Sequence, residues 1–166
     1  MKIMAALIAL MLLAGCARPG AGEGAGYPGG DFTVTLSVSV HTLLDNMHRL
    51  DREKHELVPG DGVIFAPAQV WANQGDSAFD VLHREMRAAG IHLAFRITPF
   101  LDSAYVEAIH NIFEFDAGEL SGWMYLVGGQ AQGVGASQHE LSPGDVIQWV
   151  YTLDLGRDLN GYGPWS

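Results

Sequence analysis

The chain has 166 residues and is acidic, with 9 Lys and Arg against 19 Asp and Glu and a formal net charge of −10 at pH 7. This balance disfavours nucleic acid and anionic lipid headgroups as partners, because like charges repel. Cys16 is the only cysteine, which excludes an internal disulfide and a cysteine-rich zinc site.

The N-terminus carries a processing signal. Lys2 precedes an apolar run over residues 3–13, a layout typical of a secretory signal peptide and shorter than the ~20 apolar residues of a membrane-spanning helix. The segment Leu13–Cys16 reads Leu-Ala-Gly-Cys and resembles the lipobox of bacterial lipoproteins. The resemblance implies cleavage before Cys16 and acylation of that cysteine. We therefore expect residues 1–15 to be a lipoprotein signal peptide, rather than a plain signal peptide cut after a small residue.

The next segment separates the lipid from the folded part. Residues 16–30 begin with the lipidated cysteine and continue as a glycine-rich stretch without apolar periodicity, which predicts a flexible tether. Residues 31–166 then form one domain of ordinary size. We expect this domain to lie outside the cytoplasm, held at the cell membrane through the lipid on Cys16.

The first half of the domain contains two strands and one clear helix. Strict alternation over residues 32–40 predicts a strand with one buried face, and residues 42–49 suggest a short helix. Residues 63–71 predict a second strand, in which Pro67 indicates an edge or a bulge. The clear helix is Ser77–Ala89, capped by Asp76 or Ser77 and ended by Gly90. Its expected core face consists of Phe79, Leu82, Met86 and Ala89.

The second half is rich in strands. We expect strands over residues 92–98, 105–115 with a kink at Asn111, 121–127, 138–141 and 146–153. Gly128 and Gly129 predict a tight turn after the third of these. This order predicts an α+β fold, a β-grasp-like arrangement in which a mixed or antiparallel sheet packs on one main helix at about residues 77–89.

Several motifs in the second half carry a family resemblance. They are Gly-Trp-Met-Tyr-Leu-Val-Gly-Gly over residues 122–129, Gly-Val-Gly-Ala over 133–136 and Pro-Gly-Asp-Val-Ile-Gln-Trp-Val-Tyr over 143–151. Together they resemble the transcobalamin-like C-terminal domain family, a bacterial domain of unknown function, over about Phe32 to Asp158. The resemblance implies a β-grasp-like fold. It also implies similarity to the smaller β domain of the animal cobalamin carriers, which lies over the upper face of the corrin ring.

One hairpin edge is the candidate ligand site. Strand aromatics give a flat ligand a large contact area, and glycines let the backbone approach it closely. In the cobalamin carriers a tryptophan strand followed by a Gln-Gly-apolar loop lines the corrin, and this layout is matched here. The candidate residues are Trp123, Tyr125, Gln132, Gly133, Val134 and Gly135. The alternative is that the aromatic residues pack on the helix and that the loop is an ordinary glycine-rich connection.

Metal binding and catalysis have weaker support. His41, His48 and His55 recur every seven residues and would share a face of one continuous helix, but the first strand is expected to end at His41. We therefore interpret them as solvated residues and predict no metal site. No serine has a nucleophile-elbow context, and no phosphate-binding glycine loop precedes a helix, so we predict no catalytic residues.

Two functions remain open for this non-enzymatic domain. The first is a lipid-anchored binding protein for a corrinoid (cobalamin) or a similar flat ligand. The alternative is a cell-surface structural or interaction module, in which the same hairpin edge binds a protein or a glycan.

The lipobox generates the first testable prediction. Cys16→Ser removes the sulfur that accepts the lipid, so the variant should leave the membrane fraction or retain its signal peptide. Fractionation and mass measurement of the mature chain check this. A variant that matures and partitions like the wild type would contradict the predicted lipid anchor.

Overall fold

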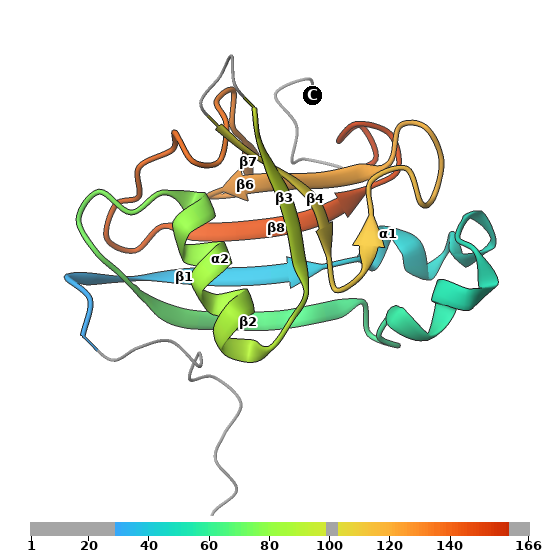
Figure 1. Cartoon of the computed structure of the whole chain (residues 1–166), viewed down its shortest axis with the longest axis horizontal. Helices are drawn as coiled ribbons and strands as arrows, with labels where there is room; N and C mark the ends of the chain where they lie inside the picture. The colour runs from blue at the N-terminus through green and yellow to red at the C-terminus, as the bar shows by residue number, and fades with distance from the viewer. Residues whose placement is uncertain (1–28, 99–102, 160–166) are drawn as a thin grey trace, which may run out of the picture.

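The fold is described by a computed structural model over residues 29–98 and 103–159, shown in Figure 1. The predicted signal peptide, with Cys16, lies outside these residues. In chain order the elements are β1 (Phe32–Ser39), α1 (His41–Leu44), the 3₁₀ helices η1 (Met47–Arg49) and η2 (Arg52–Leu57), β2 (Val63–Ala72), α2 (Ala78–Ala89), β3 (Leu93–Thr98), β4 (Ser103–Ile109), β5 (Ile112–Phe113), β6 (Gly122–Val127), β7 (Gln130–Ala131) and β8 (Val146–Thr152).

The main sheet has five strands in the order β2-β1-β8-β6-β7. β1 and β8 are parallel, whereas the β1–β2, β6–β8 and β6–β7 pairs are antiparallel, so the sheet is mixed. α2 lies across this sheet in Figure 1. The predicted α+β, β-grasp-like class with one main helix is confirmed.

A second sheet of three strands, β3-β4-β5, is an addition to the single sheet that we expected. β3 and β4 cross in front of the main sheet beside α2 in Figure 1. The second sheet contacts α2 through aromatic rings. Phe79 on α2 and Phe95 on β3 meet edge to face, with ring centroids 4.8 Å apart. Each strand of this sheet pairs with its neighbour along the chain, but the periodicity of the strands does not show that they form a sheet separate from the main one.

The ends of α2 follow the predicted capping chemistry. The Asp80 backbone N–H donates to the Ser77 hydroxyl oxygen at 3.2 Å, and the Ser77 N–H donates to the Asp80 carboxylate at 2.9 Å, forming a capping box. Gly90 ends the helix in the left-handed conformation, at φ 67°. Phe79, Leu82 and Met86 are buried as predicted, whereas Ala89 is exposed because the helix tip extends past the core.

Three local expectations need correction or refinement. Instead of one short helix over residues 42–49, the chain forms α1 and then η1, separated by a turn. Residues 138–141 form no strand and make one isolated bridge between Ser77 and Glu140. Asn111, the expected kink, belongs with His110 to a tight hairpin turn in which both have positive φ, 61° and 54°.

Pro67 lies at a bulge of an edge strand, in agreement with the prediction from the sequence. β2 is an edge strand, and its register against β1 shifts between the pairs Leu36–Ala68 and Val38–Phe65. Proline has no backbone N–H to donate, so the bulge at an edge tolerates it without an unmade ladder bond.

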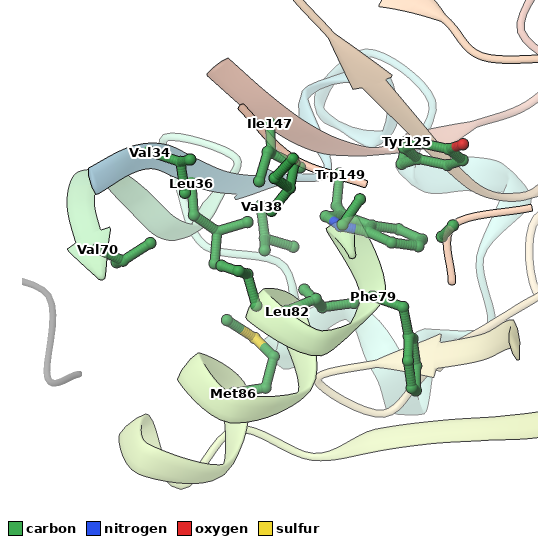
Figure 2. Packing of buried hydrophobic residues seen from close by; sticks show 14 of the residues in the cluster. Val34, Leu36, Val38, Val70, Phe79, Leu82, Met86, Tyr125, Ile147 and Trp149 are labelled. Atoms are coloured by element: carbon green, nitrogen blue, oxygen red, sulfur yellow. The ribbon is translucent and has the colours of Figure 1, made fainter. Parts of the chain in front are cut away.

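The principal core lies between α2 and the main sheet. Figure 2 shows Leu82 and Met86 of α2 pointing toward Val34, Leu36 and Val38 of β1 and toward Ile147 and Trp149 of β8. These β1 and β8 residues occupy alternate positions, as the period-2 pattern requires for one buried face.

Among the described residues, no helix is long and apolar enough to span a membrane.

The packing of Leu82 gives a prediction for stability. Leu82→Ala should lower the free energy of unfolding by ~2–5 kcal/mol, because a fully buried leucine leaves a cavity when truncated. Leu120→Ala is the matched control, since this exposed leucine should change stability by no more than ~0.5 kcal/mol. Denaturant titration measures both, and equal losses would show that Leu82 is not a core residue.

One charged side chain breaks the apolar pattern of α2. Glu85 is fully buried, and neither carboxylate oxygen has a hydrogen-bond partner. Burial raises the pKa of Glu85 above its usual 4.5, and Arg84, with its Nε 3.9 Å from Oε1, opposes this only in part. Desolvation disfavours the charged form, so the folded protein holds this proton more tightly than the unfolded chain does.

The sign of the resulting pH dependence follows. Between the unfolded and folded pKa values of Glu85 the native state binds more protons, so the contribution of this group to stability falls as pH rises above about 4.5. Glu85→Gln should therefore gain stability relative to the wild type as pH rises through this window. Melting temperatures from pH 4 to 8 test this, with the exposed Glu56→Gln as control. A Glu85→Gln difference independent of pH would contradict the prediction.

Candidate functional site

The candidate site is built on the β6–β7 hairpin. Gly128 and Gly129 form its turn at φ 59° and 78°, a backbone that side chains rarely adopt, which is why glycine occurs twice here. β6 pairs with β8 so that Trp123 lies opposite Tyr151 and Tyr125 opposite Trp149. The four aromatic residues therefore share the sheet face that covers the core.

Trp123 is tied to the interior of the domain. Its indole Nε1 donates to the Ile112 carbonyl oxygen at 2.8 Å, and its ring meets the Tyr151 ring edge to face, with centroids 5.3 Å apart. It packs against both buried clusters of the described chain. These contacts assign Trp123 a packing role, the alternative that the sequence left open for some of the aromatic residues.

Tyr125 supports the loop from below. It is only 8% exposed, its ring lies beside Trp149 with centroids 5.5 Å apart, and its hydroxyl donates to the Val134 carbonyl oxygen at 2.6 Å. Burial raises the pKa of Tyr125 from 10 to about 12, and at either value the hydroxyl is protonated at neutral pH and can donate. The hydrogen bond from Tyr125 thus fixes the position of the loop backbone relative to the sheet.

The outer part of the loop is open to solvent. Val134 is 49% exposed, and a Cβ built on Gly133 would meet no atom within 4 Å. Gln132 folds back on the hairpin, its Nε2 donating to the Gln130 carbonyl oxygen at 2.8 Å. Gly133 has no positive φ, so neither space nor backbone conformation requires a glycine there.

Gly135 differs from Gly133. A Cβ at position 135 would lie 1.8 Å from the Ser103 Oγ, so only glycine lets the loop pack against the start of β4. The Ala104 N–H donates to the Ser137 Oγ at 2.9 Å, and the Phe79 N–H donates to the Ala136 carbonyl oxygen at 3.1 Å. The inner part of the loop is therefore fastened to both β4 and α2.

The six predicted ligand-site residues thus fall into two groups. Trp123, Tyr125 and Gly135 support the hairpin from within. Gln132, Gly133 and Val134 form its outer part, in which Gly133 and Val134 are exposed and Gln132 is partly buried. The exposed part of the loop is thus the backbone at Gly133 and the side chain of Val134.

A cavity away from the β6–β7 hairpin was not anticipated from the sequence. A cavity of about 470 Å³ lies on the sheet face opposite α2. Its lining includes Ser37 and Ser39 of β1, Phe65 and Pro67 of β2, and Gln148 and Val150 of β8. Val150 could have indicated this cavity from the sequence, because it is an apolar residue at a position of β8 that alternation assigns to the polar face.

The histidines do not share a helix face. His41 belongs to α1, His48 to η1 and His55 to η2, so the continuous helix needed for a metal site is not formed. One ring nitrogen of His55 lies 3.0 Å from the Leu50 carbonyl oxygen. Within residues 29–98 and 103–159, no group of three or more His, Cys, Asp or Glu residues could hold a metal ion.

Comparisons with known proteins agree with part of the expected resemblance. A family model described as a domain of unknown function (DUF4430) matches residues 75–152, from the turn before α2 to the end of β8. No curated protein matches the sequence.

A solved structure of haptocorrin in complex with Cbi is similar in fold, with a TM-score of 0.52 and 13% sequence identity. The alignment covers 73% of this chain and 25% of the haptocorrin chain, so the protein spans about a quarter of that structure. At this identity, the likeness shows a shared fold.

Proposed function

We propose that this protein is a lipid-anchored, extracytoplasmic binding protein that contacts a corrinoid, or a similar flat ligand, with the outer β6–β7 loop. The observation that carries the proposal is the exposed backbone at Gly133 and Val134, held from below by the Tyr125 hydroxyl. A flat ligand gains most from a fixed surface, because little entropy is lost in ordering it on binding.

The similarity to haptocorrin supports the class of ligand. That protein was crystallised in complex with Cbi, and it shares the fold of this domain across 73% of the chain. The domain corresponds to only 25% of haptocorrin, so the proposal is for contact with one face of the ligand. One-sided contact buries less surface than an enclosed pocket, and we expect weak binding or binding assisted by a partner protein.

The membrane location rests on Cys16 and the tether over residues 16–30. In this proposal the glycine-rich segment is the tether between the lipid and the domain, which would let the domain reach a ligand or partner near the membrane surface. Since the chain carries a net charge of −10, attachment through a lipid is favoured over adsorption through basic side chains.

A specific observation favours the second candidate, a surface interaction module that binds a protein or a glycan, at a place other than the hairpin edge, in the segments that follow β5 and β8. Phe115 and Leu155 are 60% and 53% exposed, and both have positive φ, 69° and 50°. This backbone conformation is unfavourable for bulky side chains, and such strain occurs often at binding sites. The two residues lie near Leu120, whose carbonyl oxygen accepts the Leu155 N–H at 3.0 Å.

The corrinoid proposal is tested with the full chain and cobalamin. Binding to the native state should raise the melting temperature with increasing cobalamin, as RT ln(1 + [L]/Kd). Gly133→Trp should abolish this shift, because the added ring covers the outer loop at a position where a Cβ would meet no atom within 4 Å. Gly60→Trp is the matched control, since it is another exposed glycine with open space and no positive φ, and it should retain the shift.

Two outcomes would contradict the proposal. The first is the absence of any shift up to about 1 mM cobalamin, where binding is worth only ~4 kcal/mol. The second is an equal shift in Gly133→Trp and Gly60→Trp, which would place the ligand elsewhere. Far-ultraviolet circular dichroism verifies that both variants fold.

A further inference from the structure

The cavity opposite α2 has a polar floor. β1 and β8 pair in parallel, so that Ser37 lies beside Gln148 and Ser39 beside Val150. These residues alternate with the core residues of the same strands, which places them on the outer face of the sheet. The same face of β1 carries Thr35 before the cavity, so the hollow coincides with the change to the smaller serine side chain.

The wall of the cavity is apolar and comes from the irregular part of edge strand β2. Phe65 and Pro67 line it. Beside them the register of β2 against β1 shifts twice, once on each side of Val38. Bulges of this kind re-aim side chains and often occur next to active sites. Phe65 also packs against the principal core, so this part of the wall is in place before any ligand binds.

The polar side chains of the floor are available to a ligand. Ser37, Ser39 and Gln148 make no side-chain hydrogen bond in the part of the chain that the structure describes. Hydroxyl and amide groups both donate and accept hydrogen bonds. They therefore match a ligand that carries several hydroxyl groups, since each ligand hydroxyl also donates and accepts.

The lining disfavours an ionic ligand. No lysine or arginine is among the described residues that line the cavity, and the net charge of −10 repels anions. Asp158, the one acidic residue of this lining, already accepts the Leu153 N–H at 2.7 Å and the Thr152 hydroxyl. A charged group on the ligand would therefore lose hydration here without gaining an ion-pair partner, which costs free energy.

We propose that this cavity binds an uncharged sugar. The apolar C–H face of the sugar ring packs against the wall at Phe65 and Pro67, and its hydroxyl groups bind the polar side chains of the floor. The volume of about 470 Å³ lies within the range of about 300–1,000 Å³ that is usual for small-ligand sites. None of the described lining residues belongs to the β6–β7 loop, so this site is independent of the proposed corrinoid contact.

The first test titrates the full chain with uncharged sugars and follows binding by saturation-transfer NMR, which detects weak association. Glucose, galactose, maltose and cellobiose represent soluble sugars, and dextran represents the sugar units of a polysaccharide. At least one of them should bind, with the strongest transfer to the ring C–H protons. Derivatives of the binding sugar that carry an amino or a carboxylate group should bind about tenfold more weakly.

Two outcomes of this titration would overturn the proposal. The first is the absence of binding by all five uncharged compounds at sugar concentrations up to about 10 mM. The second is equal affinity for the charged and uncharged forms of one sugar, which the uncharged floor does not allow.

Two matched substitutions locate the sugar. Ser37→Trp fills the cavity floor, whereas Thr35→Trp makes the same change two residues earlier on the same face of β1, outside the described lining. Ser37→Trp should abolish binding and Thr35→Trp should retain it. Gly133→Trp should also retain it, which separates this site from the corrinoid contact. Equal binding by the Ser37→Trp and Thr35→Trp variants would overturn the proposal.

A milder substitution guards against a folding defect in Ser37→Trp. Gln148→Leu keeps the approximate size of the side chain and removes its hydrogen-bonding groups, so it should weaken sugar binding about tenfold. Gln69→Leu, at an exposed position of β2 outside the described lining, is the matched control and should leave the affinity unchanged. Melting temperatures verify that both variants fold. An unchanged affinity in Gln148→Leu would overturn the proposal.

Discussion

The structure depends on one non-local interaction, the parallel pairing of β1 with β8. It joins the first and last strands along the register from Thr35–Val146 to Ser39–Val150. β2 then adds on the outer side of β1, and β6 on the outer side of β8. Parallel neighbours cannot be joined by a tight hairpin, so the chain between them has to cross one face of the sheet, and α2 lies on this route.

The same pairing determines where the candidate site lies. β6 takes its register from β8, which places Tyr125 beside Trp149 and leaves its hydroxyl beneath the Val134 carbonyl. The loop is then fastened at a second point, where Gly135 and Ser137 meet the start of β4. A surface held by both sheets can keep its shape without a ligand, which is the property that recognition of a rigid flat molecule requires.

Local patterns in the sequence predict the elements well because their causes are local. Alternation gives β1, and the chemistry of Ser77 and Gly90 sets the limits of α2. By contrast, the packing of the separate sheet of β3, β4 and β5 beside α2, where Phe79 meets Phe95, is a contact that no periodicity reveals. Glu85 is another such case, because its position on α2 does not show that the opposing core leaves it without a hydrogen-bond partner.

The candidate site was predictable as a segment but not residue by residue. Gly133 and Gly135 belong to one motif and look equivalent in the sequence, yet a Cβ would be unobstructed at 133 and would collide with Ser103 at 135. Trp123 and Tyr125 likewise resemble a pair of ligand contacts, although hydrogen bonds and ring contacts direct both toward the protein. Folding requirements therefore account for Trp123, Tyr125 and Gly135 and leave Gly133 unexplained. Neither backbone conformation nor packing requires glycine at position 133, as at Gly60, so this position can accept a side chain without a change in the fold.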